Sequence, residues 1–312
     1  MARYSAWYNN QSDGMVFAGK VLYGYKGVMP ENTSIEIPFG TISIGNSAFC
    51  DCSNLTNVTI PNSVKYIGKR AFRNCTNIDN ILIPDSVTAI GDSAFVYCTS
   101  IDNVVIPNSV TTIGENIFGH CTSLKNITIP DSITDISYGT FSDCTNLENI
   151  AIPDGVTNIG EYAFYGCENL KNINIPNGVK SIKESTFNGC KSLINITIPE
   201  KVTNIGDYAF TDCKSLVSLV IPNSVKKIGY RAFENCSALE TITIPNSVTS
   251  ILESAFDGCK NLTIMGYKNS VAENYAKENE INFIELIKKI ITGDADENEI
   301  VDINDVTYLQ RH

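Results

Sequence analysis

Cysteine recurs in this chain at a fixed interval of 23 residues, with no insertion or deletion along the series. Ten of the eleven cysteines belong to the series: Cys52, Cys75, Cys98, Cys121, Cys144, Cys167, Cys190, Cys213, Cys236 and Cys259. A constant period of this length is the sequence signature of a solenoid, in which one small unit is stacked many times. We therefore expect one continuous stack, with function on its repeated surface or at its non-repeating ends.

The segment LTNVTIPNSVKYIGKRAFRNCTN, residues 55–77, shows what one unit contains. Val58 and Ile60 alternate with polar residues, which predicts a short extended segment with one face buried. Pro61 has no amide proton and is expected where strand pairing stops. The remaining inward residues are Leu55, Val64, Ile67 and Phe72. No unit can bury these side chains alone, so neighbours must stack, and ten units at about 4.8 Å each give a length of about 50 Å.

The pattern Leu-x-x-Ile-x-Ile-Pro, followed by Ile-Gly-x-x-Ala-Phe-x-x-Cys, resembles the leucine-rich repeats of the BspA type over residues 31–286. The resemblance implies a mainly β repeat solenoid: a right-handed curved stack of about ten 23-residue repeats, with a parallel sheet and short helical or irregular turns. It also implies bacterial surface proteins with roles in adhesion and recognition. The column of Gly68 holds Ser137, Lys183 and Leu252 in three repeats, so a left-handed backbone is favoured there but not required.

The cysteine series indicates buried thiols and argues against disulfides. Adjacent units of a parallel stack hold their Cβ atoms about 5 Å apart, which is wider than the roughly 3.8 Å of a disulfide. We therefore interpret the ten thiols as small apolar core groups. Cys50 lies outside the series and is the candidate for exposure. Ten equivalent nucleophiles would have no chemical purpose, so a catalytic cysteine is not expected.

Composition and charge narrow the functional class. The 312 residues are 43% hydrophobic and 18% charged, which fits a folded protein. The net charge of −11 argues against nucleic-acid binding, and no apolar run is long enough for a membrane span. The first residues contain no apolar signal segment. The family resemblance nevertheless implies an extracellular or cell-surface location.

The two ends differ from the repeats. Residues 1–30 are rich in aromatic residues, including the single tryptophan Trp7, and we favour a hydrophobic cap over a sugar-stacking platform. Ser270 and Glu273 have the spacing of a helix capping box, which predicts a helix over 270–279 and then a strand. The expected divisions are a cap at 1–30, the solenoid at 31–268, a second cap at 269–290, and a calcium loop with a helix at 291–312.

Oxygen-bearing side chains near the C-terminus have the spacing of a calcium-binding loop. Positions 1, 3, 5, 9 and 12 of a 12-residue loop are held by Asp294, Asp296, Asn298, Asp302 and Asp305. The backbone carbonyl of Ile300 falls at position 7. Calcium is thus the one cofactor that the sequence predicts, and a solvated acidic tail is the alternative.

This loop and the following Val306-x-x-Leu309-x-Arg311 resemble the first half of a type I dockerin. That family uses two such loops to bind a cohesin on a scaffold protein. Glu299 replaces the usual glycine at position 6, which is expected to weaken the site. The resemblance implies a second hypothesis, a cellulosome-type component recruited to a cohesin once the module is completed.

The outward face of the predicted strands carries an uncharged strip of amides and hydroxyls. One column holds Asn57, Asn80, Asn103, Asn126, Asn149, Asn172 and Asn195, and the neighbouring column includes Thr128 and Thr197. Stacked asparagines can hydrogen-bond to one another, which is a structural role. The same strip is the candidate contact surface for a protein or glycan partner. Both interpretations stay open at the level of the sequence.

Motifs for catalysis are missing from the sequence. His120 and Cys121 are adjacent, so they do not easily form the spaced pair of nucleophile and base that catalysis needs. No phosphate-binding glycine loop and no HExxH zinc motif occurs. We therefore expect a non-enzymatic protein that works by binding.

Overall fold

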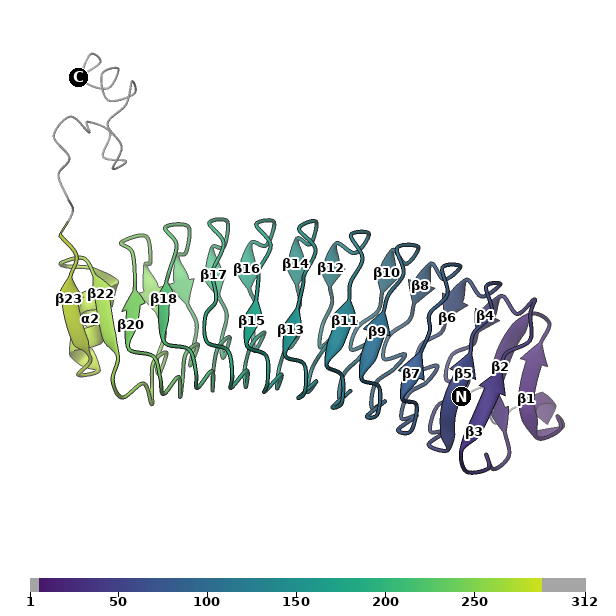
Figure 1. Cartoon of the computed structure of the whole chain (residues 1–312). Coiled ribbons are helices and arrows are strands. Elements are labelled where there is room, and N and C mark those ends of the chain that lie inside the picture. The colour runs from purple at the N-terminus through teal and green to yellow at the C-terminus, as the bar shows by residue number, and fades with distance from the viewer. Residues whose placement is uncertain (1–5, 288–312) are drawn as a thin grey trace, which may run out of the picture.

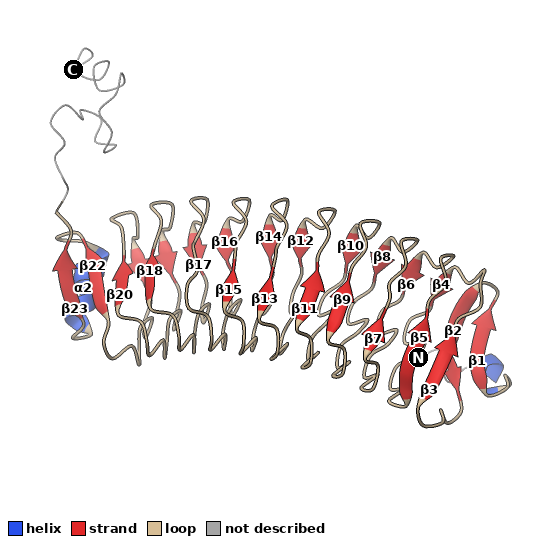
Figure 2. Cartoon of the chain, viewed as in Figure 1, coloured by secondary structure: helices blue, strands red, loops and turns tan. Residues whose placement is uncertain are grey.

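The computed structural model describes residues 6–287, which form one long, gently curved stack (Figure 1). Most 23-residue units contribute two short strands, and the strands of each kind form a row along the stack (Figure 2). The predicted parallel, mainly β solenoid is confirmed. The stack has about 12 turns rather than ten, because cap residues at both ends add strands to the ladders.

The first row of strands, which we call the first ladder, carries the predicted asparagine column. Its members are β3 (Thr33–Glu36), β5 (Leu55–Thr59), β7 (Asn80–Ile81), β9 (Asn103–Val105), β11 (Asn126–Thr128), β13 (Asn149–Ile150), β15 (Asn172–Ile173), β18 (Ser218–Val220), β20 (Thr241–Thr243), β22 (Thr263–Gly266) and β23 (Asn282–Glu285). Paired neighbours run parallel, and the register is 23 residues in the repeats, so Asn57 lies beside Asn80. Within residues 6–287, the pairing is interrupted between β11 and β13 and between Asn195 and β18. A single bridge from Asn172 continues the row to Asn195. As expected, β5 ends before Pro61.

The second ladder follows the turn after the Ile-Pro pair. It consists of β4 (Ser43–Ile44), β6 (Tyr66–Ile67), β8 (Ala89–Ile90), β10 (Thr112–Ile113), β12 (Asp135–Ile136), β14 (Asn158–Ile159), β16 (Ser181–Ile182), β17 (Asn204–Ile205), β19 (Lys227–Ile228) and β21 (Ser250–Ile251). Its isoleucines face inward, and Ile67 and Val64 are fully buried as the sequence predicted. The two strands of each unit thus enclose the core on two sides.

The segment from Ala71 to Cys75 forms a turn, which closes the unit on its third side. Parallel hydrogen bonds also join these turns: the Phe49 amide donates to the Ala71 carbonyl at 2.7 Å, and Phe72 repeats this with the next unit at 2.8 Å. The backbone is left-handed at Arg70 (φ 56°) and Asn74 (φ 60°). The turn is therefore held by its own hydrogen-bond ladder, although it contains no strand.

The column of Gly68 is glycine because of a close approach between backbones, so the prediction of a left-handed backbone there is wrong. Its φ is not in the left-handed region, which begins two residues later. A Cβ on Gly68 would lie 2.7 Å from the Asn46 amide nitrogen and 2.7 Å from the Gly45 carbonyl carbon. Only glycine lets the two turns approach so closely without a shift of the backbone.

The second ladder is interrupted where a side chain replaces this glycine. It breaks between β10 and β12 and between β14 and β16, and the second strand of each break leads directly into Ser137 or Lys183. In other units, the backbone amide at this position donates a hydrogen bond to the preceding turn, as the Gly91 amide does to the Ile67 carbonyl at 2.8 Å. Within residues 6–287, the amides of Ser137 and Lys183 make no such bond. Leu252 keeps the bond at 3.0 Å, so a side chain here weakens the ladder without always breaking it.

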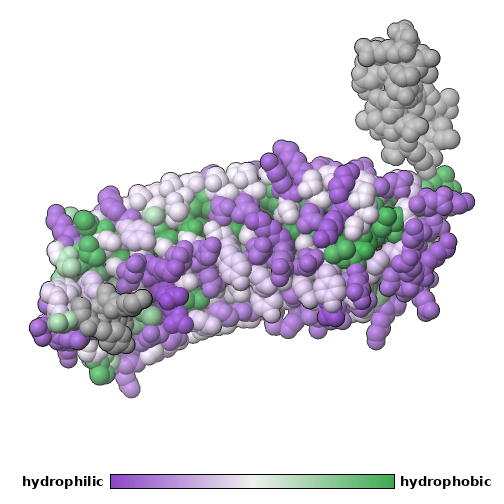
Figure 3. All heavy atoms as spheres, turned by 180° about the vertical axis from the view of Figure 1, so that it is seen from behind, coloured by the Kyte–Doolittle hydropathy of each residue, from purple (hydrophilic) through white to green (hydrophobic). Residues whose placement is uncertain are grey.

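Phenylalanines fill the centre of the stack. One ring per unit, from Phe49 to Phe256, stacks on the next with centroids 5.2 to 6.1 Å apart. The widest gap, 6.1 Å between Phe118 and Phe141, coincides with the first break in the second ladder. Hydrophilic and neutral side chains cover most of the face seen from behind, because the large apolar residues are inside (Figure 3).

Both ends of the core are covered. At the N-terminal end, the hairpin of β1 (Gly14–Ala18) and β2 (Val21–Lys26) pairs with β4, beside the short helix α1 (Ala6–Asn9). At the C-terminal end, α2 (Val271–Glu278) begins at Ser270, whose hydroxyl accepts from the Glu273 amide as predicted. Tyr275 of α2 closes the phenylalanine column against Phe256 at 5.7 Å. No helix in residues 6–287 has the length and apolar character to cross a bilayer.

Candidate binding face

The outward positions of the first ladder form a continuous surface, which we call the polar strip. Its amide column holds Ser34, Asn57, Asn80, Asn103, Asn126, Asn149, Asn172, Asn195, Ser218, Thr241, Thr263 and Asn282. Its second column holds Glu36, Thr59, Leu82, Val105, Thr128, Ala151, Asn174, Thr197, Val220, Thr243, Met265 and Ile284. The seven predicted asparagines, with Thr128 and Thr197, are all exposed and aligned here.

The polar strip is almost free of charge, although the chain has a net charge of −11. Among the residues just named, only Glu36 is ionisable, and it lies at the N-terminal end. Charged residues stand beside the strip instead, in the column that precedes the asparagines. Within it, Lys171 Nζ pairs with Glu148 at 2.8 Å, and the hydrogen bond from Lys171 lowers the pKa of that carboxyl. The strip itself is therefore suited to a neutral polar ligand.

Most asparagine side chains of the amide column make no hydrogen bond within residues 6–287. Asn126 Nδ2 donates to Asn103 Oδ1 at 2.9 Å, and this is the single amide-to-amide link of the column within the described residues. In the same part of the chain, Asn149, Asn172 and Asn195 make no side-chain hydrogen bond. The predicted asparagine ladder is thus realised at one step only. Asn57 Nδ2 donates to Ser34 Oγ at 3.4 Å, and Asn103 Nδ2 donates to Asp102 Oδ1 at 2.7 Å. The amides of Asn80, Asn149, Asn172 and Asn195 present both donors and acceptors to the solvent.

One hollow lies on the strip, and a larger one lies at its edge, where the charged column meets the asparagines. The larger, of about 800 Å³, is lined by Thr56, Asn57, Asp79, Asn80, Ser100, Asp102, Asn103, Ser123, Lys125 and Asn146. The smaller, of about 460 Å³, is lined by residues of three successive turns, among them Asn149, Asn172, Asn195 and Thr197. In the second column of the strip, Leu82 and Val105 are 74% and 58% exposed. The strip therefore combines amide groups with accessible apolar side chains, as ligand sites do.

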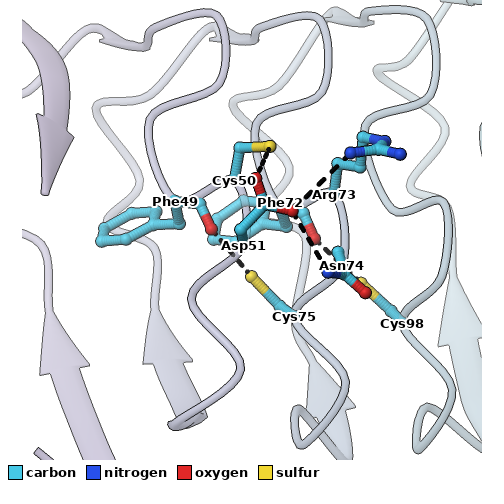
Figure 4. A network of polar contacts seen from close by, with 8 residues as sticks. All are labelled: Phe49, Cys50, Asp51, Phe72, Arg73, Asn74, Cys75 and Cys98. Carbon is cyan, nitrogen blue, oxygen red and sulfur yellow. Dashed lines mark hydrogen bonds and ion pairs between the residues drawn. The ribbon is translucent and has the colours of Figure 1, made fainter. Parts of the chain in front are cut away.

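The cysteine series belongs to the core and not to a site. Figure 4 shows Cys75 and Cys98 directing their sulfurs at carbonyls of the preceding turns: Cys75 Sγ donates to the Phe49 oxygen at 3.0 Å, and Cys98 Sγ to the Phe72 oxygen at 3.1 Å. Burial raises the pKa of the Cys75 thiol far above its usual range. The thiols are thus buried as predicted, but they also satisfy carbonyls, which the sequence did not reveal. Cys52, counted with the buried series, is partly exposed.

His120 and Cys121 face different groups. His120 Nδ1 lies 3.2 Å from the Asp143 carboxylate, and its ring stacks on Tyr97 with centroids 4.3 Å apart. Cys121 is buried and donates to the Phe95 carbonyl at 3.2 Å. The two side chains therefore do not form a pair of nucleophile and base.

The predicted calcium ligands lie outside the described residues: Asp294, Asp296, Asn298, Ile300, Asp302 and Asp305. In residues 6–287, no group of three or more histidine, cysteine or carboxylate side chains is arranged to hold a metal ion.

Comparison with known proteins places the chain in a family. The model of the BspA type leucine-rich repeat region matches residues 25–148 and 135–263, more than half of the chain. This chain belongs to that family. Among curated proteins, none matches it.

Solved structures of other leucine-rich repeat proteins resemble this BspA-type chain. One from T. pallidum shares 30% identity, with 63% of this chain and 82% of that one covered and a TM-score of 0.45. A leucine rich cell surface protein from Faecalibacterium prausnitzii A2-165 shares 26% identity over 89% of this chain and all of its own, with a TM-score of 0.47. One from Bacteroides ovatus shares 26% over 90% of this chain and all of its own, with a TM-score of 0.40.

Proposed function

We propose that this BspA-type chain is a non-enzymatic binding protein that holds a protein or glycan partner on its polar strip. The observation that carries the proposal is the run of exposed, uncharged amides without side-chain partners, as at Asn149, Asn172 and Asn195. The fold keeps them in line because they are spaced by the strand separation of about 4.8 Å. An extended ligand can then contact several turns at once, and many weak hydrogen bonds add up.

The partner that suits this strip is neutral, polar and extended. Amide groups both donate and accept, which matches sugar hydroxyls and peptide groups equally well. Leu82 and Val105, exposed in the second column of the strip, add apolar contact area. We place the protein at the cell surface or outside the cell, by analogy with the Faecalibacterium relative that is named a cell surface protein.

The test is a binding screen of the full chain against mucin glycans and extracellular-matrix proteins. In the double variant Asn149→Arg/Asn172→Arg, two bulky charges enter the smaller hollow without breaking any side-chain hydrogen bond. We expect affinity for the bound probe to fall by about tenfold or more. The matched control is Thr134→Arg/Thr157→Arg, which adds the same charge at exposed positions beside the second ladder. Equal binding by both variants and the parent would refute the assignment of the strip.

A second proposal concerns residues 291–312, and the sequence spacing of the oxygen ligands supports it. We propose that Asp294, Asp296, Asn298, Asp302 and Asp305, with the carbonyl of Ile300, bind calcium, and that the completed module binds a cohesin. Isothermal titration of the full chain with calcium is the test, with Asp294→Ala/Asp296→Ala as the control. We expect heat of binding from the parent chain alone. Equal heats from both proteins, or none from either, would remove the calcium site.

A further inference from the structure

The turns carry a second set of exposed aromatic side chains, away from the polar strip. Five tyrosines between the second ladder and the cysteines form two clusters, which we call the tyrosine edge: Tyr138, Tyr162 and Tyr165, then Tyr208 and Tyr230. Tyr138 is 46% exposed and Tyr165 is 36% exposed, and Tyr162, Tyr208 and Tyr230 are half-buried. The sequence analysis assigned no role to these residues.

The first cluster is held in a fixed arrangement. The Tyr162 ring lies between its neighbours, with centroids 5.4 Å from Tyr138 and 5.8 Å from Tyr165. Its hydroxyl donates to Glu184 Oε1 at 2.8 Å, across the gap to the next turn. Rings and carboxylate therefore form one rigid group, and little conformational freedom remains to be lost on binding.

In the second cluster, Tyr208 and Tyr230 meet edge to face with centroids 5.4 Å apart. The Arg231 guanidinium already lies 5.0 Å from the centre of the Tyr230 ring. This contact shows that the cluster accommodates a guanidinium over a tyrosine face.

Tyrosine stands at two of these positions in an unfavourable backbone conformation. Tyr162 and Tyr208 have φ values of 58° and 57°, in the left-handed region that bulky residues avoid. Most other turns place serine, asparagine or glycine at the same position, such as Ser93 and Asn116, and two turns place arginine there, Arg70 and Arg231. Backbone strain of this kind is concentrated at functional sites, such as those that bind ligands.

Acidic residues beside the tyrosines favour a basic partner. Between Tyr138 and Tyr230, the same column holds Glu161, Glu184 and Asp207 on three successive turns. Asp207 accepts the Tyr230 amide at 2.9 Å, but none of the three forms a salt bridge with another described residue. Lys183 and Arg231 are the cations carried by these turns. Aromatic faces beside carboxylates that have no salt bridge attract guanidinium and ammonium groups.

We infer that the tyrosine edge is a docking site for a basic peptide segment. Tyr162 and Tyr208 occupy the same column two turns apart, which is about 10 Å at the strand spacing. Roughly three residues of extended chain cover that distance, so basic side chains separated by two residues reach both clusters. Their guanidinium groups stack on the tyrosines and bond to Glu161, Glu184 and Asp207.

The test uses a short synthetic peptide with the sequence Gly-Arg-Ser-Ser-Arg-Gly, with blocked ends, and a permuted peptide with adjacent arginines. In the variant Tyr162→Ser/Tyr208→Ser, the net charge is unchanged and each serine is a residue that other turns already use at this position. We expect the variant to bind the spaced peptide about tenfold more weakly than the parent does, from the loss of two cation–π contacts. We also expect the parent to prefer the spaced peptide over the permuted one.

Several results would overturn this inference: equal affinity of the parent and the tyrosine variant for the spaced peptide, or no preference between the peptides. A glycan array on which the tyrosine variant loses neutral sugars that the parent binds would assign the edge to sugars instead. A thermal melt of the variant, expected to match the parent, checks that it folds. The strip variant Asn149→Arg/Asn172→Arg should bind the peptide normally. The peptide assay therefore tests the tyrosine edge independently of the polar strip.

Discussion

Replacing one glycine of the Gly68 column tests how the turns are packed. In Gly91→Ala, the new Cβ would lie 2.6 Å from the Lys69 nitrogen and 3.0 Å from the Gly68 carbonyl carbon. Both are backbone atoms, so the turns must separate. The Gly91 amide then loses its 2.8 Å bond to Ile67. Overpacking costs about 1–3 kcal/mol and a lost hydrogen bond about 0.5–1.5 kcal/mol, so we expect destabilisation of about 2–4 kcal/mol.

The matched control is Gly155→Ala, because the nearest atom to its new Cβ is 3.8 Å away. Its effect on the free energy of unfolding is expected to stay within about 0.5 kcal/mol. Urea unfolding followed by circular dichroism measures both variants. Hydrogen exchange at residue 91 checks the lost bond locally, since repeat proteins need not unfold in one step. Equal stability of the two variants, or full protection at residue 91, would refute the close-approach explanation.

The chain itself suggests a compensating change. Where Ser137 and Lys183 replace the glycine, threonine replaces alanine three residues later, and Thr140 Oγ1 donates to the Ser137 carbonyl at 2.8 Å. Thr186 bonds to the Lys183 carbonyl in the same way at 3.0 Å. In a Gly91→Ser/Ala94→Thr cycle, the double variant is therefore expected to be more stable than the sum of the single effects predicts.

The remaining predictions concern the core. Phe164→Ala, whose ring lies 5.5 and 5.6 Å from its two neighbours, should cost about 3–5 kcal/mol in a urea titration, and a loss below about 1 kcal/mol would contradict the stacked column. Burial raises the pKa of the thiols of Cys75, Cys98, Cys121, Cys144, Cys167, Cys190 and Cys213. The folded chain thus holds these protons to higher pH. The thiols should therefore leave the stability unchanged between about pH 6 and pH 8 and lower it as the pH passes the unfolded value of about 8.5, and a flat urea midpoint up to pH 10 would oppose this. A small thiol reagent should label the partly exposed Cys50 and Cys52 quickly in the native protein, and rapid labelling of all eleven cysteines would mean that the thiols are not buried.

The repeat period determined much of the fold before the structure was known. Because the phase of the cysteines, Ile-Pro pairs and phenylalanines is constant, it fixes which residues stack and which face inward, and Val64, Ile67 and Phe72 are all fully buried. Backbone angles cannot be obtained in this way. A glycine column has two explanations, a left-handed angle or a close approach, and only coordinates show that Gly68 has the second. The hydrogen bonds of the cysteine thiols were missed for a similar reason, since they join residues 26 positions apart.

The polar strip was visible in the sequence because asparagine repeats in register, and strand pairing then aligns it. The hollows depend on how neighbouring side chains project, so they were not predictable. The tyrosine edge was missed because its members do not repeat in one column. A signal was present: Tyr162 and Tyr208 stand in a column that holds serine, asparagine or glycine in most other turns and arginine in two, Arg70 and Arg231. A tyrosine at this left-handed position points to a role outside the core.

An arginine scan of the asparagine column tests the central claim most directly. Each of the seven asparagines from Asn57 to Asn195 is replaced singly, and the affinity of a glycan or protein partner found in the screen is measured for each variant. A ligand lying along the strip predicts weaker binding over a contiguous run of turns, with normal binding beyond it. Unchanged affinity in all seven variants, or losses scattered without regard to their order along the stack, would contradict the account.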